Sequence, residues 1–229
     1  MLAPARDHSS RSGRGLRIAA ASGPGHSPRR PAVLPATTTA RLATLPRYEG
    51  HPVPFVVPWG GCRTVRARDA ALGWVQNCEC VPGRCTPHFG QLCPPRQRQV
   101  MLGRACQVCG HPVAAGQPVW FCTIQGREWN REPGFHAGCG QVAFRACPGL
   151  AGYRRDPGTR VLVAGCTTYR LAFSLSGDDG PCCLTPAQAK ASCSQGRTVR
   201  WAWAALDNPA FYTIGEWLRH AYRCRRRSA

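Results

Sequence analysis

The chain has 229 residues, which is room for one domain of ordinary size with or without a tail. Thirty basic residues against 11 acidic ones give a net charge of +19. No apolar run approaches the roughly 18 residues that a membrane-spanning helix needs, so we exclude an integral membrane protein and expect no membrane partner.

The positive charge is concentrated at the two ends of the chain. Residues 1–46 hold seven Arg and one Asp, and residues 219–229 hold five Arg and no acid, so together they carry +11 of the +19. Solvated tails, encoded by a GC-rich genome that favours Arg codons, explain this charge at least as well as a nucleic-acid surface does. Both nucleic acid and protein therefore stay open as partners.

The N-terminal residues 1–46 are rich in Arg, Ser, Ala, Gly and Pro and poor in large apolar side chains. This composition predicts a disordered basic arm. An organelle transit peptide and an over-extended translation start are alternatives for the same segment. We expect a single α+β domain over residues 47–224, followed by a basic tail over 225–229.

Short strands are expected at several points along this domain. Residues 51–59 predict an edge strand broken by prolines, and residues 73–76, 117–124 and 198–204 predict further strands. Residues 160–164 and 167–175 flank Gly165 and predict a hairpin.

Three helices are expected between and after these strands. The first covers 96–102, with Pro94 and Pro95 in its first turn, and the second covers 135–147. A final helix is expected to begin at Pro209, capped by Asp207 or Asn208. Its apolar residues recur at spacings of three and four and predict an amphipathic face packed on the core, formed by Phe211, Ile214, Leu218 and Ala221.

Fifteen cysteines are many for this length, and their number is odd. The only early apolar stretch, residues 18–21, is too short for the core of a secretory signal. A reduced, cytoplasmic, metal-binding protein explains the cysteines better than a disulfide framework does.

Two pairs of metal-ligating residues stand in an order typical of zinc modules. Cys106 and Cys109 enclose two residues and precede Gly110, and His136 and Cys139 lie three residues apart, on one face of a helical turn. The 26 residues between the pairs are enough for a hairpin. Three sulfurs and one imidazole complete a tetrahedral Zn²⁺ shell, so we predict zinc at Cys106, Cys109, His136 and Cys139.

A shell closed by four protein ligands indicates a structural rather than a catalytic ion. Zinc binding of this kind supplies on the order of 10 kcal/mol of folding free energy, which would offset a modest core. A thioredoxin-like redox pair at Cys106 and Cys109, or four unrelated side chains, are the alternatives. A metal-dependent enzyme is the less favoured function, because the sequence has no His-x-Glu deaminase motif, phosphate-binding loop or matching nuclease pattern.

The remaining cysteines form looser groups. A second cluster contains Cys78, Cys80, Cys85, His88 and Cys93, with Cys62 upstream, and its spacings match no familiar metal site. We interpret these as small buried thiols and leave a second metal site open. Cys122 is expected to pack inside the strand of the zinc module, Cys147 to be a spare ligand or buried, and no metal is predicted at Cys182, Cys183 and Cys193.

The turn that carries Cys106 and Cys109 (the knuckle), the expected hairpin and the helix with His136 and Cys139 together resemble a treble-clef zinc finger over residues 106–150. A longer stretch, 48–224, resembles a family of uncharacterised actinobacterial proteins. The shared features are Phe89-Gly90-Gln91-Leu92, Pro94-Pro95-Arg96-Gln97-Arg98, the knuckle, Cys139, Cys147-Pro148 and the ending Trp201–Cys224. This resemblance implies no established activity. We therefore expect a zinc-stabilised binding module for protein or nucleic acid.

Overall fold

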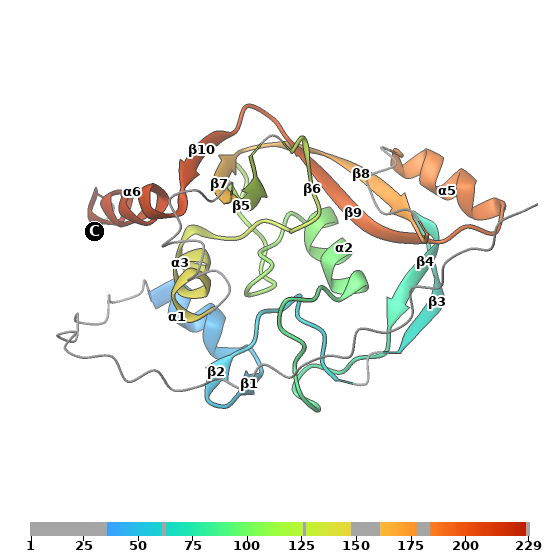
Figure 1. The fold of residues 1–229 in the computed structure, drawn as a ribbon, viewed down its shortest axis with the longest axis horizontal. Coiled ribbons are helices and arrows are strands. Elements are labelled where there is room, and N and C mark those ends of the chain that lie inside the picture. Colours follow the sequence, from blue (N-terminus) through green and yellow to red (C-terminus); the bar gives the residue numbers. More distant parts are fainter. Residues whose placement is uncertain (1–35, 61–62, 126, 148–160, 178–183, 228–229) are drawn as a thin grey trace, which may run out of the picture. The chain divides into compact units, whose positions relative to one another are not determined.

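The larger sheet is built around β9 (Val199–Leu206), shown in the computed structural model of Figure 1. Along one edge, β8 (Tyr169–Leu175) pairs antiparallel with the whole strand. On the other edge β9 pairs with β4 (Gly73–Cys78) only at Val199, and with β6 (Trp129–Asn130) at Ala204 and Ala205. β3 (Thr64–Asp69) completes the sheet by pairing antiparallel with β4.

The structure describes residues 36–60, 63–125, 127–147, 161–177 and 184–227, with side chains up to Ala221. All of them belong to one unit, Leu34–Ala229.

A second, three-stranded sheet is antiparallel, in the order β10-β7-β5. Its strands are β5 (Val119–Ile124), β7 (Val161–Cys166) and β10 (Ala210–Thr213). β1 (Arg47–Tyr48) and β2 (His51–Pro52) form a small separate ribbon.

Five helices lie in the described residues. They are α1 (Ala36–Ala43), α2 (Pro94–Leu102), α3 (Ala137–Ala146), α5 (Pro186–Ser194) and α6 (Ile214–Arg227). α2 and α5 pack on the larger sheet, whereas α3 contacts α1, α6 and β5. Proline occupies the first turn of α2, as predicted, because its missing N–H would have no intrahelical partner there.

Two main hydrophobic cores result. The first joins the larger sheet to α2 and α5 around Val75, Phe121, Phe173 and Leu175. The second joins α1, α3, α6, β5 and β7 and is rich in aromatic rings. Trp217 is fully buried in it, with ring centroids 5.5 Å from Phe144 and 5.7 Å from Phe135.

The mixture of helices and sheets confirms the coarse fold expectation. The helices predicted at 96–102 and 135–147 and the strands predicted at 73–76, 117–124 and 198–204 are present, with shifted ends. The expected edge strand at 51–59 is reduced to the two residues of β2 and one bridge between Trp59 and Pro87.

The hairpin expected from 160–164 and 167–175 is wrong. β7 and β8 are consecutive strands, but β7 pairs with β5 and β10, whereas β8 pairs with β9. The chain changes sheets at residues 167–168, between β7 and β8.

The disordered arm expected at 1–46 is wrong for its last part. Residues 36–43 form α1, and Thr38, Leu42 and Leu45 are buried. The small side chains around them did not indicate a buried helix, but Leu42 of α1 and Leu45 just after it belong to the second core. The rest of the arm, residues 1–35, lies outside the described residues.

The last helix begins later than predicted. Residues 210–213 form β10, where Phe211 is 56% exposed and so belongs to no buried helical face. The cap is provided by Thr213, whose hydroxyl accepts from the Glu216 N–H, while the Glu216 carboxylate accepts from the Thr213 N–H. Ile214, Trp217 and Ala221 are buried in α6, so the predicted set missed Trp217.

Candidate metal centre

The first two predicted ligands lie in a tight turn between α2 and β5. The Gly110 N–H donates to the Cys106 carbonyl at 2.8 Å, and the Cys106 N–H donates to the His111 carbonyl at 2.9 Å. Gly110 has a φ of 74°, and a Cβ there would lie 2.8 Å from the ring of Phe55. The glycine is therefore required both by the turn and by the ring packed against it.

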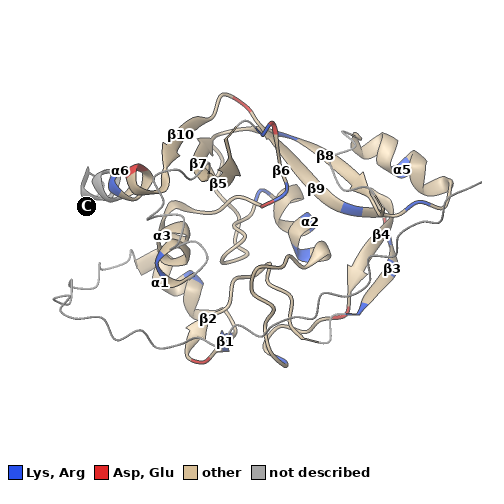
Figure 2. Cartoon of the chain, viewed as in Figure 1, with Lys and Arg blue, Asp and Glu red and all other residues tan. Residues whose placement is uncertain are grey.

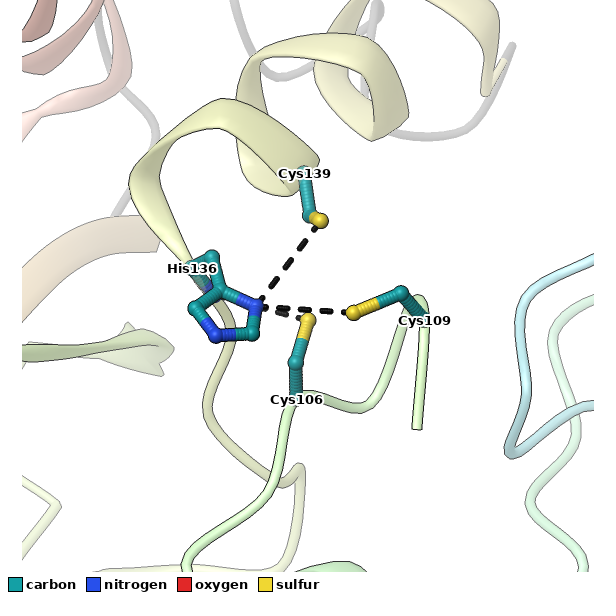
Figure 3. A group of neighbouring side chains, drawn as sticks. All are labelled: Cys106, Cys109, His136 and Cys139. Atoms are coloured by element: carbon teal, nitrogen blue, oxygen red, sulfur yellow. Dashed lines mark hydrogen bonds between the residues drawn. The ribbon is translucent and has the colours of Figure 1, made fainter. Parts of the chain in front are cut away.

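The other two ligands are placed by β5 and α3. Trp120 in β5 and Phe135 exchange backbone hydrogen bonds of 2.7 and 3.1 Å, which fixes the residue just before His136. His136 is the N-cap of α3, and Cys139 lies in the first turn of that helix. Their side chains therefore point to the same side, toward the turn that carries Cys106 and Cys109 (Figure 3).

The four ligand atoms converge on one point. All lie within 4.8 Å of one another, and all four residues are buried. The Nδ1 atom of His136 is 3.5 Å from the Cys109 sulfur and 3.9 Å from the Cys139 sulfur. A tetrahedral ion with metal–sulfur bonds of about 2.3 Å and a metal–nitrogen bond of about 2.0 Å separates such ligands by about 3.5 Å. The donor set therefore fits a tetrahedral metal ion.

The surrounding groups orient the imidazole for this task. The Nε2 atom of His136 lies 3.0 Å from the Pro112 carbonyl, which accepts its hydrogen, so that Nδ1 is the ring atom that faces the sulfurs and is available to a metal ion. The His136 N–H donates to the Cys106 sulfur at 3.4 Å. Both contacts stabilise the ligand geometry and the negative charge on sulfur.

The electrostatics of the cluster favour a cation. Hydrogen bonds from the Cys106 and Cys139 thiols lower the pKa of Cys109. Burial alone would lower the pKa of His136, but the neighbouring Cys106 and Cys109 sulfurs outweigh it and raise this pKa to about 9. In the absence of metal, the site therefore combines a thiolate with an imidazolium, whose proton a metal ion can replace.

This arrangement can hold an ion but offers no position for a substrate. Four protein ligands complete the shell, and the cluster lies within the aromatic second core. Catalytic zinc sites instead keep one position for water or substrate.

One part of the predicted module is different. The hairpin expected between the ligand pairs does not form, because β5 pairs with β7 and β6 pairs with β9. Only the bridge between Trp120 and Phe135 joins β5 to the later segment.

The other cysteines differ in burial and in whether they lie near further ligand atoms. Cys85 and His88 are exposed and stay outside any cluster, whereas Cys122 and Cys147 are half-buried. Burial raises the pKa of Cys122 to about 12, as expected for an inert packed thiol. Cys193 is buried against β4, while Cys62, Cys182 and Cys183 lie outside the described residues.

The structure brings together three cysteines of the looser group at which a second metal site was left open. Cys78, Cys80 and Cys93, which we interpreted as separate buried thiols, have their sulfurs within 4.8 Å of one another. The signal that could have shown this is the Cys-x-Cys pair followed by a cysteine at the start of a helix.

Comparisons of the chain with protein families, with curated proteins and with solved structures found no match. Among the described helices, none is long and apolar enough to cross a membrane. The function is therefore inferred from the cluster of Cys106, Cys109, His136 and Cys139.

Proposed function

We propose that the protein is a zinc protein in which a structural Cys₃His centre stabilises a binding module for nucleic acid or protein. The observation that carries this proposal is the convergence of four buried ligand atoms from two separate chain segments. Three thiolates and one imidazole in a tetrahedral arrangement suit Zn²⁺ better than Mg²⁺ or Ca²⁺, which prefer oxygen ligands. Thiolate ligands also favour a reducing compartment, so we place the protein in the cytoplasm.

We further propose that residues 106–150 are a variant of the treble clef. The order of knuckle, strand and ligand-bearing helix supports this assignment. The hairpin is reduced to the bridge between Trp120 and Phe135, because β6 pairs with β9 of the larger sheet. The actinobacterial family resemblance stays a proposal on the residues quoted for it.

Nucleic acid is the partner that the charge favours. The described arginines are spread over several elements rather than gathered in one stripe (Figure 2). One exposed pair, Arg66 and Arg68 on β3, flanks the ring of Trp74, with guanidinium carbons 4.4 and 5.7 Å from its centroid. Trp59 and Trp201 are buried and so are not available for stacking on bases. We therefore propose that phosphate contacts come mainly from the charged ends.

The salt dependence of duplex DNA binding tests this proposal. Replacing Arg225, Arg226 and Arg227 by Ala should weaken binding to all sequences alike. The slope of log affinity against log salt is negative, and it should become shallower by up to about 3, since each phosphate contact contributes about −0.9 on B-DNA. An Arg66→Ala, Arg68→Ala protein is the matched control and should change the slope less. Absence of DNA binding by the full chain at physiological salt would reject nucleic acid and leave a protein partner.

A further inference from the structure

A buried arginine marks a second site that the Cys₃His centre does not explain. Arg96, in the first turn of α2, is only 9% exposed. One of its terminal nitrogens donates to the Phe55 carbonyl at 2.9 Å. The only ion pair among the described residues joins Arg170 to Asp207, so Arg96 meets no carboxylate there. Burying a guanidinium is costly unless its N–H groups are hydrogen-bonded and its charge is compensated, so the group beside its second terminal nitrogen matters to this site.

The group beside that nitrogen is a sulfur rather than a carboxylate. The second terminal nitrogen of Arg96 donates to the Cys80 sulfur at 2.6 Å. The Cys80 sulfur lies 3.7 Å from the sulfur of Cys93, the residue that caps α2. The Cys80 N–H donates to the Cys78 sulfur at 3.3 Å. The Arg96 guanidinium is therefore placed to compensate negative charge on the Cys80 sulfur when that sulfur binds a metal ion.

The three sulfurs have the spacing of metal ligands. They lie within 4.8 Å of one another. Cys78 is the last residue of β4, and Cys93, which is fully buried, directly precedes α2. Two thiolates on one tetrahedral ion, each about 2.3 Å from it, are separated by about 3.8 Å. The 3.7 Å between Cys80 and Cys93 matches this value, and is far longer than the roughly 2.05 Å of a disulfide.

We propose that Cys78, Cys80 and Cys93 form a second metal centre, at which their sulfurs bind a thiophilic ion such as zinc and Arg96 compensates the thiolate charge. Three thiolates and one Zn²⁺ carry a net charge of −1, which the guanidinium neutralises. Three sulfurs leave one position of a tetrahedron for a further ligand. This centre is separate from the Cys₃His site and shares none of its ligands.

The oxidation state of Cys78 controls this centre. Cys78 is disulfide-bonded in the structure, and a disulfide sulfur is not a thiolate ligand. A dithiol reductant transfers two electrons and two protons to that disulfide and is itself oxidised to a disulfide, which releases Cys78 and its partner as thiols. Zinc then displaces the proton of the Cys78 thiol. Metal binding and the disulfide at Cys78 are therefore mutually exclusive states of one cluster.

Zinc content after reduction tests the proposal. The full chain, purified with a phosphine reductant and excess zinc followed by desalting, should hold two equivalents. Cys80→Ser and Cys93→Ser should each lower this to one, while Cys109→Ser loses the other ion. Cys85→Ser, an exposed cysteine of the same segment, is the control and should keep two. Omitting the reductant should leave the wild type with one.

A single equivalent in the fully reduced wild type, or an unchanged content in Cys80→Ser, would overturn the proposal. A Cys80→His protein guards against simple misfolding, because it keeps a ligand atom at the half-buried position. Loaded with Co²⁺, it should bind two ions, and its sulfur-to-cobalt absorption should be weaker than that of the wild type. The same absorption in both proteins would show that Cys80 does not bind the metal.

Discussion

At the residue scale, the Gln97 side chain hydrogen-bonds to the backbone of β9 at a position where no neighbouring strand does. β9 is paired along its second edge only at its two ends, and α2 covers the gap between them. The Gln97 amide donates to the Ala202 carbonyl at 2.6 Å and accepts from the Ala202 N–H at 3.2 Å. It also donates to the Arg131 carbonyl at 2.8 Å. One side chain thus satisfies backbone groups that would otherwise be buried without partners.

Replacing this glutamine should lower the free energy of unfolding even when leucine, a side chain of similar shape, takes its place. Gln97→Leu leaves the Ala202 groups unpaired in a fully buried position, so we expect unfolding to become easier by about 2–4 kcal/mol. Gln99→Leu, two residues along the same helix and exposed, should change stability little. Denaturant unfolding of both proteins measures the difference, and equal stabilities would contradict this role for Gln97.

At the scale of elements, α1 and α3 approach closely at a glycine. A Cβ on Gly138 would collide with the Thr38 hydroxyl, so the absence of a side chain lets the two helices meet. Gly138 lies between the ligands His136 and Cys139, which means that α1 packs directly against the ligand-bearing turn.

Gly138→Ala should therefore destabilise the protein by about 1–3 kcal/mol, despite alanine's better helix propensity. The control is Gly215→Ala in the first turn of α6, where the nearest atom is 3.7 Å away on a flexible Arg219 side chain. That protein should be as stable as the wild type or slightly more so. If thermal unfolding shows the two variants to be alike, α1 does not pack on α3 as described.

The sequence predicted local features of these elements better than their partners. The prolines of α2, the β-branched and aromatic run of β5 and the Cys106–Cys109 and His136–Cys139 pairs are all short-range signals. Strand partners are not local, and so the register of β5 on β7 could not be derived. For the same reason the sequence could not show which cysteines of the second group converge, because the packing of α2 brings Cys93 to Cys80.

At the scale of the whole molecule, the Cys₃His centre joins chain segments that are distant in sequence. Its ligands belong to the same core as Leu42 of α1, Val163 of β7 and Trp217 of α6. Because the ion would connect the knuckle to α3 inside this core, metal binding and folding of this half should be coupled.

Zinc affinity should rise with pH across the neutral range. The pKa of His136 is raised to about 9 without metal, so the ring carries a proton at pH 7 that zinc must displace. Thiols that are still protonated must also lose their protons. We expect more than one proton released per zinc at pH 7 and weaker binding as the pH falls. Calorimetric titration in buffers of different ionisation enthalpy counts these protons, and a count below one would contradict the assigned ligands.

The metal content of the Cys109→Ser protein tests the central claim most directly. The Cys₃His assignment predicts that it holds one zinc equivalent fewer than the wild type prepared in parallel, and that it melts at a lower temperature. Cys122→Ser, which removes a half-buried sulfur from neighbouring β5, should keep the wild-type content. A Cys109→Ser protein with wild-type zinc content and wild-type melting temperature would contradict the account.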